Sequence, residues 1–162
     1  MKIALGSDEA NELTRFLIED LGKRGHTLVL RGPIDAQCAD PDVDWPLTSS
    51  HVAELVARGE VDEGIVCCWT GTGASIAANK VPGIRAALCH DAETARGARI
   101  WNHANVLALS LRATSIPMAR EILDAWFSTA ITTGEAQTEW NRQQIERVTQ
   151  LERKYSQPAF KR

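Results

Sequence analysis

Short apolar runs alternate with longer amphipathic segments along most of the chain, and this alternation constrains the fold more than any other feature. Each run has the length of a strand, and helical periodicity follows it. Residues 63–69 are almost continuously apolar, as expected for a central parallel strand that is buried on both faces. The predicted strands are, in order, KIALGS, HTLVLRG, EGIVCCW, IRAALCH and ANVLALS.

This strand–helix order predicts an α/β fold, with a five-stranded parallel sheet in the order 2-1-3-4-5, right-handed crossovers and helices on both faces. A chain of 162 residues is expected to form one domain, residues 1–162. The C-terminal segment, residues 130–162, adds an amphipathic helix over residues 140–155, WNRQQIERVTQLERKY. Its apolar stripe would pack either on a partner subunit or on the chain's own sheet.

Composition excludes several classes of partner. The net charge of −3 and the pI near 5.8 give no reason to expect nucleic acid or a membrane surface. No apolar run approaches the ~20 residues that span a bilayer. The start of the chain, MKIALGSDEA, is too short in apolar residues for a signal peptide, so we expect a cytoplasmic protein with its four cysteines as thiols.

The segment CCWTGTGASIAANK, residues 67–80, follows the third strand and falls where an active site is expected. Ligands of open parallel sheets bind beyond the carboxyl ends of strands where the strand order reverses, here between the first and third strands. Gly71 and Gly73 allow a sharp turn, and the start of the next helix offers free N–H groups to an anion. A Cys68 thiolate beside such donors suits removal of a carbon-bound proton next to a carbonyl.

Simpler interpretations stay open at this point. Cys68 could be a small core residue, and Asp8 could be only the N-cap of the first helix. The chain has neither a complete phosphate-binding loop nor a dinucleotide glycine motif after its first strand, which argues against a nucleotide cofactor. CxxC and HxxxH spacings are also missing, which disfavours zinc bound by Cys67, Cys68, Cys89, His90 and His103.

Four segments resemble, in order, the ribose-5-phosphate isomerase type B and galactose-6-phosphate isomerase family: IALGSDEA, DVDWP, GTGASIAANKVPGIRAALCHD and NHANVLALSLR. They cover most of the first 112 residues. The resemblance implies a Rossmann-like three-layer αβα sandwich, assembled as a homodimer or a dimer of dimers with active sites shared across the interface. It also implies aldose–ketose isomerisation of a sugar phosphate through a cis-enediolate, with neither a metal ion nor an organic cofactor.

The resemblance assigns roles to individual positions. Cys68 falls on the family's catalytic base, and Thr70 on the threonine near the ring oxygen and the developing oxyanion. Asp8 falls on a ligand of a substrate hydroxyl and Arg112 on a phosphate ligand. Asn102 falls on a residue that reaches the substrate, either in its own subunit or in the neighbouring one. The pocket lining and the loop whose backbone holds the enediolate comprise Asp44, Trp45, Gly71, Gly73 and Ser75.

The chain also departs from the family pattern near the expected substrate. Glu9 and Trp101 stand where the family has histidines associated with phosphate contact and ring opening. TTGEAQTEWNR replaces a Gly-Gly-Arg-His segment, and Arg142 could supply the missing phosphate contact. These losses favour a shorter open-chain sugar or one without phosphate. His103 could take over the acid role, although a solvent-facing loop residue is the simpler interpretation. The alternative function is a non-catalytic sugar-phosphate binder or structural subunit.

Overall fold

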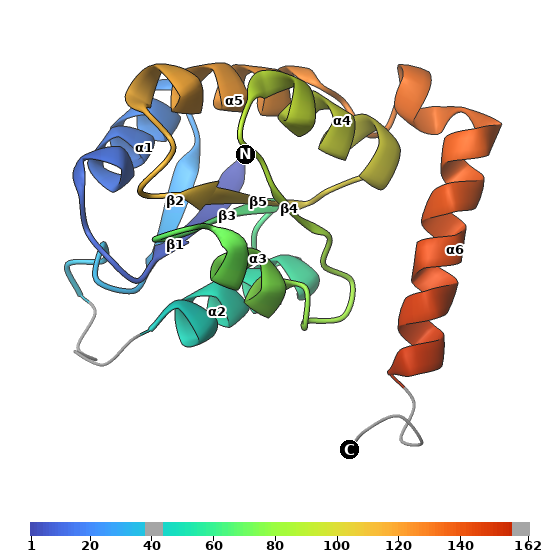
Figure 1. Cartoon of the computed structure of the whole chain (residues 1–162), viewed down its shortest axis with the longest axis horizontal. Coiled ribbons are helices and arrows are strands. Elements are labelled where there is room, and N and C mark those ends of the chain that lie inside the picture. Colours follow the sequence, from blue (N-terminus) through green and yellow to red (C-terminus); the bar gives the residue numbers. More distant parts are fainter. Residues whose placement is uncertain (38–43, 157–162) are drawn as a thin grey trace.

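The computed structural model describes residues 1–37 and 44–156, and its strands form one parallel sheet (Figure 1). Each strand corresponds to one of the predicted apolar runs, which confirms the α/β fold. The strands are β1 (Lys2–Ser7), β2 (Thr27–Arg31), β3 (Glu63–Cys68), β4 (Ala86–Leu88) and β5 (Val106–Ser110).

The strand order differs in one detail from the prediction. The sheet runs β2-β1-β3-β5-β4, so β5 rather than β4 lies beside β3. All five residues of β5 are buried, whereas the three residues of β4 are half-buried. The longer, wholly apolar strand therefore takes the inner position, and the short strand takes the edge. In both orders the strand order reverses between β1 and β3, where the site was expected.

Helices cover both faces of the sheet and complete the three layers (Figure 1). One apolar cluster joins the sheet to α1 (Glu12–Lys23), α4 (Ala92–Asn102) and α5 (Ile116–Ser128). A second cluster joins the other face to α2 (Trp45–Ala57) and α3 (Thr72–Ala78). Since strand side chains alternate between faces, consecutive residues of each inner strand contribute to different clusters.

The last helix, α6 (Glu139–Tyr155), follows the short 3-10 helix η1 (Gly134–Gln137) and lies beside the β4 edge, apart from both layers (Figure 1). It contacts α4 and η1. Val148, Leu151 and Tyr155 are each about half exposed, at 45%, 52% and 54%. The apolar stripe is therefore not covered by the chain's own sheet.

A buried ion pair ties the amino end of β3 to α4 and α5. The Glu63 carboxylate lies 2.6 Å from the Arg99 guanidinium and accepts a 2.6 Å hydrogen bond from the Trp126 indole N–H. Burial raises the pKa of Glu63, while Arg99 and Trp126 act to lower it. Arg99 also donates to the carbonyl oxygens of Ala104 and Thr129, so its charge is well satisfied. In the described ranges, no helix is long and apolar enough to cross a membrane.

Candidate active site

The two adjacent cysteines at the end of β3 lie in different environments. Cys67 belongs to the apolar cluster under α1, α4 and α5, whereas Cys68 belongs to the cluster under α2 and α3. Both are buried, at 1% and 4% exposure. Burial, with a smaller contribution from neighbouring charge, raises the pKa of the Cys67 thiol, so Cys67 stays neutral. Cys68 is the thiol on the side of the glycine loop.

The glycine loop folds back over Cys68. Gly71 has a φ of 75° and is the N-cap of α3, and its N–H donates to the Cys68 carbonyl oxygen at 3.2 Å. The N–H of Ala74 then donates to the Cys68 sulfur at 3.4 Å. The Cys68 sulfur therefore has a fixed backbone donor in the first turn of α3.

The N–H groups of the loop are not all free to hold an oxyanion. Gly71 donates to Cys68, and the N–H of Ser75 donates to the Gly71 carbonyl at 3.0 Å. The Ser75 hydroxyl bonds to the Ala86 carbonyl of β4 at 3.2 Å, away from the thiol. Gly73 lies in the first turn of α3, where N–H groups have no intrahelical acceptor. Of the three loop positions predicted, the backbone of Gly73 is best placed to receive a ligand.

Threonine hydroxyls and an indole ring form the rim above the loop. The Oγ1 atoms of Thr70 and Thr72, both exposed, lie 2.6 Å apart. Trp45 opens α2, and its ring lies 2.9 Å from where a Cβ on Gly73 would stand. A side chain at position 73 would therefore require the Trp45 ring to move. The preceding residue, Asp44, is the N-cap of α2 and accepts from the Leu47 N–H at 3.1 Å.

Asp8 directly follows β1 and holds a buried carboxylate oxygen, Oδ1, without a hydrogen-bond partner among the described residues. Burial raises the pKa of Asp8, and the negative charges of Glu9 and Asp44 raise it further. The N-cap of α1 is Asn11, whose side chain accepts from Thr14, so the N-cap interpretation of Asp8 is wrong. An unpaired buried acceptor at a strand exit is a place where a ligand hydroxyl can donate.

Arg112 lies on the opposite side of Cys68 from Asp8. Because β3 runs between β1 and β5, the thiol lies between an acidic strand exit, Asp8 and Glu9, and a basic one, Arg112. The N–H of Arg112 donates to the Trp69 carbonyl at 3.1 Å. The guanidinium carbon of Arg112 lies 5.8 Å from the centroid of the Trp69 ring.

Sequence reasoning did not single out Trp69. The available signal was its position between Cys68 and Thr70, directly after a buried strand, where a large apolar side chain has no core to enter. In the structure its ring is 57% exposed, so it is part of the rim of the site.

Three predicted substrate-binding residues lie away from Cys68 within one chain. Trp101 and Asn102 end α4 and precede β5, whereas the far end of β5, Ser110, is aligned with Cys68. They therefore lie at the opposite end of the sheet. The Trp101 ring packs on Gly97 of its own helix, and its N–H donates to Glu135 at 3.4 Å. On the surface of α6, Arg142 pairs with Glu139.

His103 and Asn105 both hydrogen-bond to the backbone of neighbouring segments and thereby stabilise the fold. His103 is the C-cap of α4 with a φ of 48°, and its Nε2 lies 2.9 Å from the Ala136 carbonyl oxygen. It is half-buried, so the solvent-facing interpretation is wrong. The Asn105 side chain accepts from Arg85 N–H and donates to the Gly83 carbonyl. Among the described residues, no group of three or more His, Cys, Asp or Glu side chains could hold a metal ion.

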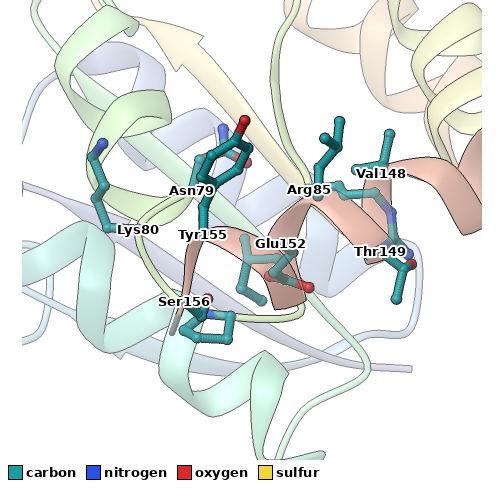
Figure 2. A pocket seen from close by; sticks show the side chains of 11 residues that line it. Asn79, Lys80, Arg85, Val148, Thr149, Glu152, Tyr155 and Ser156 are labelled. Carbon is teal, nitrogen blue, oxygen red and sulfur yellow. The ribbon is translucent and has the colours of Figure 1, made fainter. Parts of the chain in front are cut away.

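Two clefts separate α6 from the rest of the chain. The first, of about 480 Å³, lies between α6 and residues 79–85, and Figure 2 shows side chains from both segments lining it. Within it, Glu152 accepts a 2.6 Å hydrogen bond from the Gly83 N–H. The second, of about 340 Å³, is lined by β4, α6, Trp101 and Asn102. Trp101 and Asn102 therefore border a cleft that the chain itself leaves open.

The fold and these side chains define an α/β protein with polar groups at the strand exits on either side of one buried thiol, at the switch point of a parallel sheet. Such sites bind small polar molecules and act on them with acid–base groups. Residues 3–144 match the family model described as Ribose/Galactose Isomerase. The chain belongs to this family, as its sequence predicted.

Individual relatives agree with this assignment. Ribose-5-phosphate isomerase B of Escherichia coli is 36% identical over 154 residues, which cover 94% of this chain and 97% of the relative. D-erythrulose-4-phosphate isomerase of Pectobacterium atrosepticum is 38% identical over 129 residues, covering 78% and 82%. The solved structure of Clostridium thermocellum ribose-5-phosphate isomerase B is 39% identical with a TM-score of 0.82, covering 96% and 99%. The prediction of an enzyme of the isomerase class is confirmed.

Proposed function

We propose that this chain interconverts an aldose and a ketose, both carrying a phosphate, through a cis-enediolate with Cys68 as the base. The named relatives are isomerases of sugar phosphates, which supports the reaction class. The observation that carries the proposal is the 3.4 Å hydrogen bond from the Ala74 N–H to the Cys68 sulfur. A sulfur held in this way is a preformed proton acceptor at the floor of the site.

In the proposed reaction the Cys68 thiolate removes the proton from C2 of the aldose, and the electron pair of that bond forms the enediolate. The same thiol then returns the proton to C1, while the hydroxyl proton at C2 transfers to the oxygen at C1, which gives the ketose. Gly73 N–H, which has no intrahelical acceptor, and the exposed Thr70 hydroxyl would stabilise the negative oxygen. A base in this position contributes about 10²- to 10⁴-fold to the rate.

The two sides of the site would hold different ends of the substrate. The unpaired Asp8 Oδ1 would accept from a sugar hydroxyl, and the carboxylates of Glu9 and Asp44 nearby would repel a phosphate. Arg112, at the opposite strand exit, would bind the phosphate, since a guanidinium matches phosphate geometry with parallel N–H donors. The substrate would therefore lie across the end of β3 with its reacting carbons over Cys68.

The proposed assembly is a homodimer, or a dimer of dimers, in which each site is completed by its neighbour. The half-exposed stripe of α6 and the open cleft beside Trp101 and Asn102 support this, because one chain leaves both uncovered. A partner seated there would bring Trp101, Asn102 and Arg142 to a site that lacks them within one chain. Trp101 cannot exchange protons as histidine does, so the favoured substrate is a short sugar phosphate that stays open-chain.

Subunit mixing tests the shared site. Cys68→Ala and Asn102→Ala chains, each inactive alone, would form mixed dimers in which one of two sites has both residues intact. Random mixing should restore about a quarter of wild-type activity, since half of the dimers are mixed and each has one good site. If each site belonged to a single chain, mixing would restore nothing.

Direct assay tests the reaction. The protein would be incubated with four-, five- and six-carbon aldose and ketose phosphates and their unphosphorylated forms, and products would be followed by NMR. We expect conversion of at least one phosphorylated sugar, most readily a tetrose phosphate. Binding of a sugar phosphate without conversion of any would favour a non-catalytic binder with the same fold.

A further inference from the structure

We propose that Trp69 is a positioning residue that holds the Arg112 guanidinium in place for the phosphate of the substrate. This inference rests on the proposed function, in which Arg112 is the phosphate ligand. The role of Trp69 follows from contacts just past the carboxyl ends of β3 and β5, where the two segments no longer pair as strands.

Three hydrogen bonds join the ends of these two strands, and a fourth, from Gly71, closes the glycine loop on Cys68. The Trp69 carbonyl accepts from the Ser110 hydroxyl at 2.9 Å and from the Arg112 N–H at 3.1 Å. The Cys68 carbonyl accepts from the N–H of Leu111 at 3.0 Å and of Gly71 at 3.2 Å. Trp69 and Arg112 are therefore fixed relative to each other and to the reactive thiol, because each is joined to the same short piece of backbone.

The side chains then meet outside the core. The Trp69 ring stays 57% exposed, although burying such a ring elsewhere would be favourable. The Arg112 guanidinium lies over this ring, 5.8 Å from its centroid. A guanidinium held by an aromatic face keeps the N–H donors at its edge free for an anion, whereas a guanidinium held by a carboxylate does not.

The described arginines divide into those with and those without a carboxylate partner, and the second group comprises Arg15, Arg31, Arg85, Arg112, Arg147 and Arg153. Arg24, Arg58 and Arg142 each form an ion pair with a carboxylate. Within residues 1–37 and 44–156, Arg112 forms no ion pair. The Arg112 guanidinium is exposed and has no close carboxylate among the described residues, so its N–H donors are open to an anion. Its backbone hydrogen bond to Trp69, the residue after Cys68, distinguishes it from the other unpaired arginines.

Inorganic phosphate is the probe, because its binding requires no turnover. Isothermal titration calorimetry would give its Kd for the wild type, Trp69→Ala, Trp69→Phe and Arg112→Ala. We expect Trp69→Ala to weaken phosphate binding about two- to fivefold, the range of an exposed cation–π contact. KM for the phosphorylated sugar should rise by the same factor with kcat nearly unchanged, and Trp69→Phe should restore both. Arg58→Ala, which also removes one exposed cation, should leave Kd unchanged.

The double variant separates positioning from a general structural effect. In an Arg112→Ala background, Trp69→Ala should cause no further loss of phosphate affinity, because the group that Trp69 holds is already gone. Equal phosphate affinity in the wild type and Trp69→Ala would overturn the inference. So would an undiminished effect of Trp69→Ala in the Arg112→Ala background, or a wild type that binds no phosphate. If no sugar is isomerised while the Trp69–Arg112 coupling is measured, the inference stands and the proposed isomerase function fails.

Discussion

The Cys68 sulfur lies 3.4 Å from the backbone nitrogen of Ala74, which donates a hydrogen bond to it. Among the described residues, the neighbouring Cys67 sulfur has no such backbone donor, because strand alternation turns it to the other face of the sheet, into the cluster under α1, α4 and α5. Two chemically identical side chains, adjacent in sequence, are thereby separated into a neutral core thiol and a thiol under a glycine loop. The proposed chemistry depends on this difference.

The cysteine pair gives a matched test of the proposed base. Cys68→Ala should lower kcat about 10²- to 10⁴-fold, the contribution of a positioned base, with substrate affinity retained. Cys67→Ala removes a buried sulfur and should cost about 1 kcal/mol of stability while leaving kcat unchanged. Steady-state kinetics and urea unfolding of both variants provide the comparison. Equal kcat in Cys68→Ala and the wild type would remove Cys68 from the mechanism.

Gly71→Ala should disrupt the loop. Its φ of 75° disfavours any side chain, and a Cβ there would stand 2.5 Å from the Leu88 side chain and 2.9 Å from the backbone of Leu109. We expect a shift of the loop that lowers kcat/KM about 100-fold, as misplacement by about 1 Å does. Gly59→Ala is the control, because Gly59 has a similar φ of 68° but open space around its Cβ position. It should cost about 1–2 kcal/mol of stability and no activity; equal loss of activity in both variants would contradict the role of the loop.

Asp8→Asn should raise the stability of the fold and weaken substrate binding. Burial raises the folded pKa of Asp8 above its ordinary value of 3.8, so the folded chain keeps this proton to higher pH than the unfolded chain. The stabilisation from protonated Asp8 is therefore complete below the unfolded pKa and is lost as pH rises through the folded pKa. At pH 7, Asp8→Asn should be more stable than the wild type, because it removes a carboxylate whose ionisation is penalised by burial, and it should have a higher KM.

Urea unfolding at several pH values checks the Asp8 prediction. Between the unfolded and the folded pKa of Asp8, the free energy of unfolding of the wild type should fall relative to that of Asp8→Asn as pH rises. A difference that is the same at pH 3 and pH 7 would contradict the raised pKa. An unchanged KM would show that the Asp8 carboxylate does not contact the sugar.

Glu63→Ala should be strongly destabilising without altering the site. It would leave the buried Arg99 guanidinium without its carboxylate, which typically costs about 3–5 kcal/mol. The exposed pair of Glu54 with Arg58 offers a control, since Glu54→Ala should cost less than about 1 kcal/mol. Urea unfolding measures both. Because Glu63 begins β3 and Cys68 ends it, the kcat of the Glu63→Ala protein that remains folded should stay near the wild-type value. Similar free energies of unfolding for Glu63→Ala and Glu54→Ala would contradict the importance of the buried pair.

The fold could be predicted because apolar periodicity reports burial directly, and each predicted run became a strand. The order of β4 and β5 could not, since IRAALCH and ANVLALS have similar apolar content, and only packing shows that the first pairs over just three residues. The start of α1 was misjudged at Asp8. The capping box of Asn11 and Thr14, visible in the sequence NELT, was the better signal.

The candidate site could be predicted in part. β1 and β3 are neighbours both in the predicted order and in the structure, so topology alone placed the exits that carry Asp8 and Cys68 side by side. Arg112 came from the resemblance, and it follows β5, which the predicted order had not placed next to β3. Trp101 and Arg142 came from the resemblance, and one chain places Trp101 at the other end of the sheet and Arg142 on the surface of α6. The contact of Trp69 with Arg112 depends on side-chain direction beyond the strand ends, on which periodicity carries no information.

Exchange of carbon-bound protons in deuterated water tests the central claim most directly. Wild-type protein and Cys68→Ala would be incubated with the sugar phosphates of the panel, and deuterium at C1 and C2 would be followed by NMR. A cis-enediolate formed by Cys68 predicts deuterium at C1 or C2 of at least one sugar phosphate with the wild type and none above background with Cys68→Ala. Equal incorporation with the wild type and with Cys68→Ala would contradict the account, as would a wild type that binds these sugars and exchanges none of their carbon-bound protons.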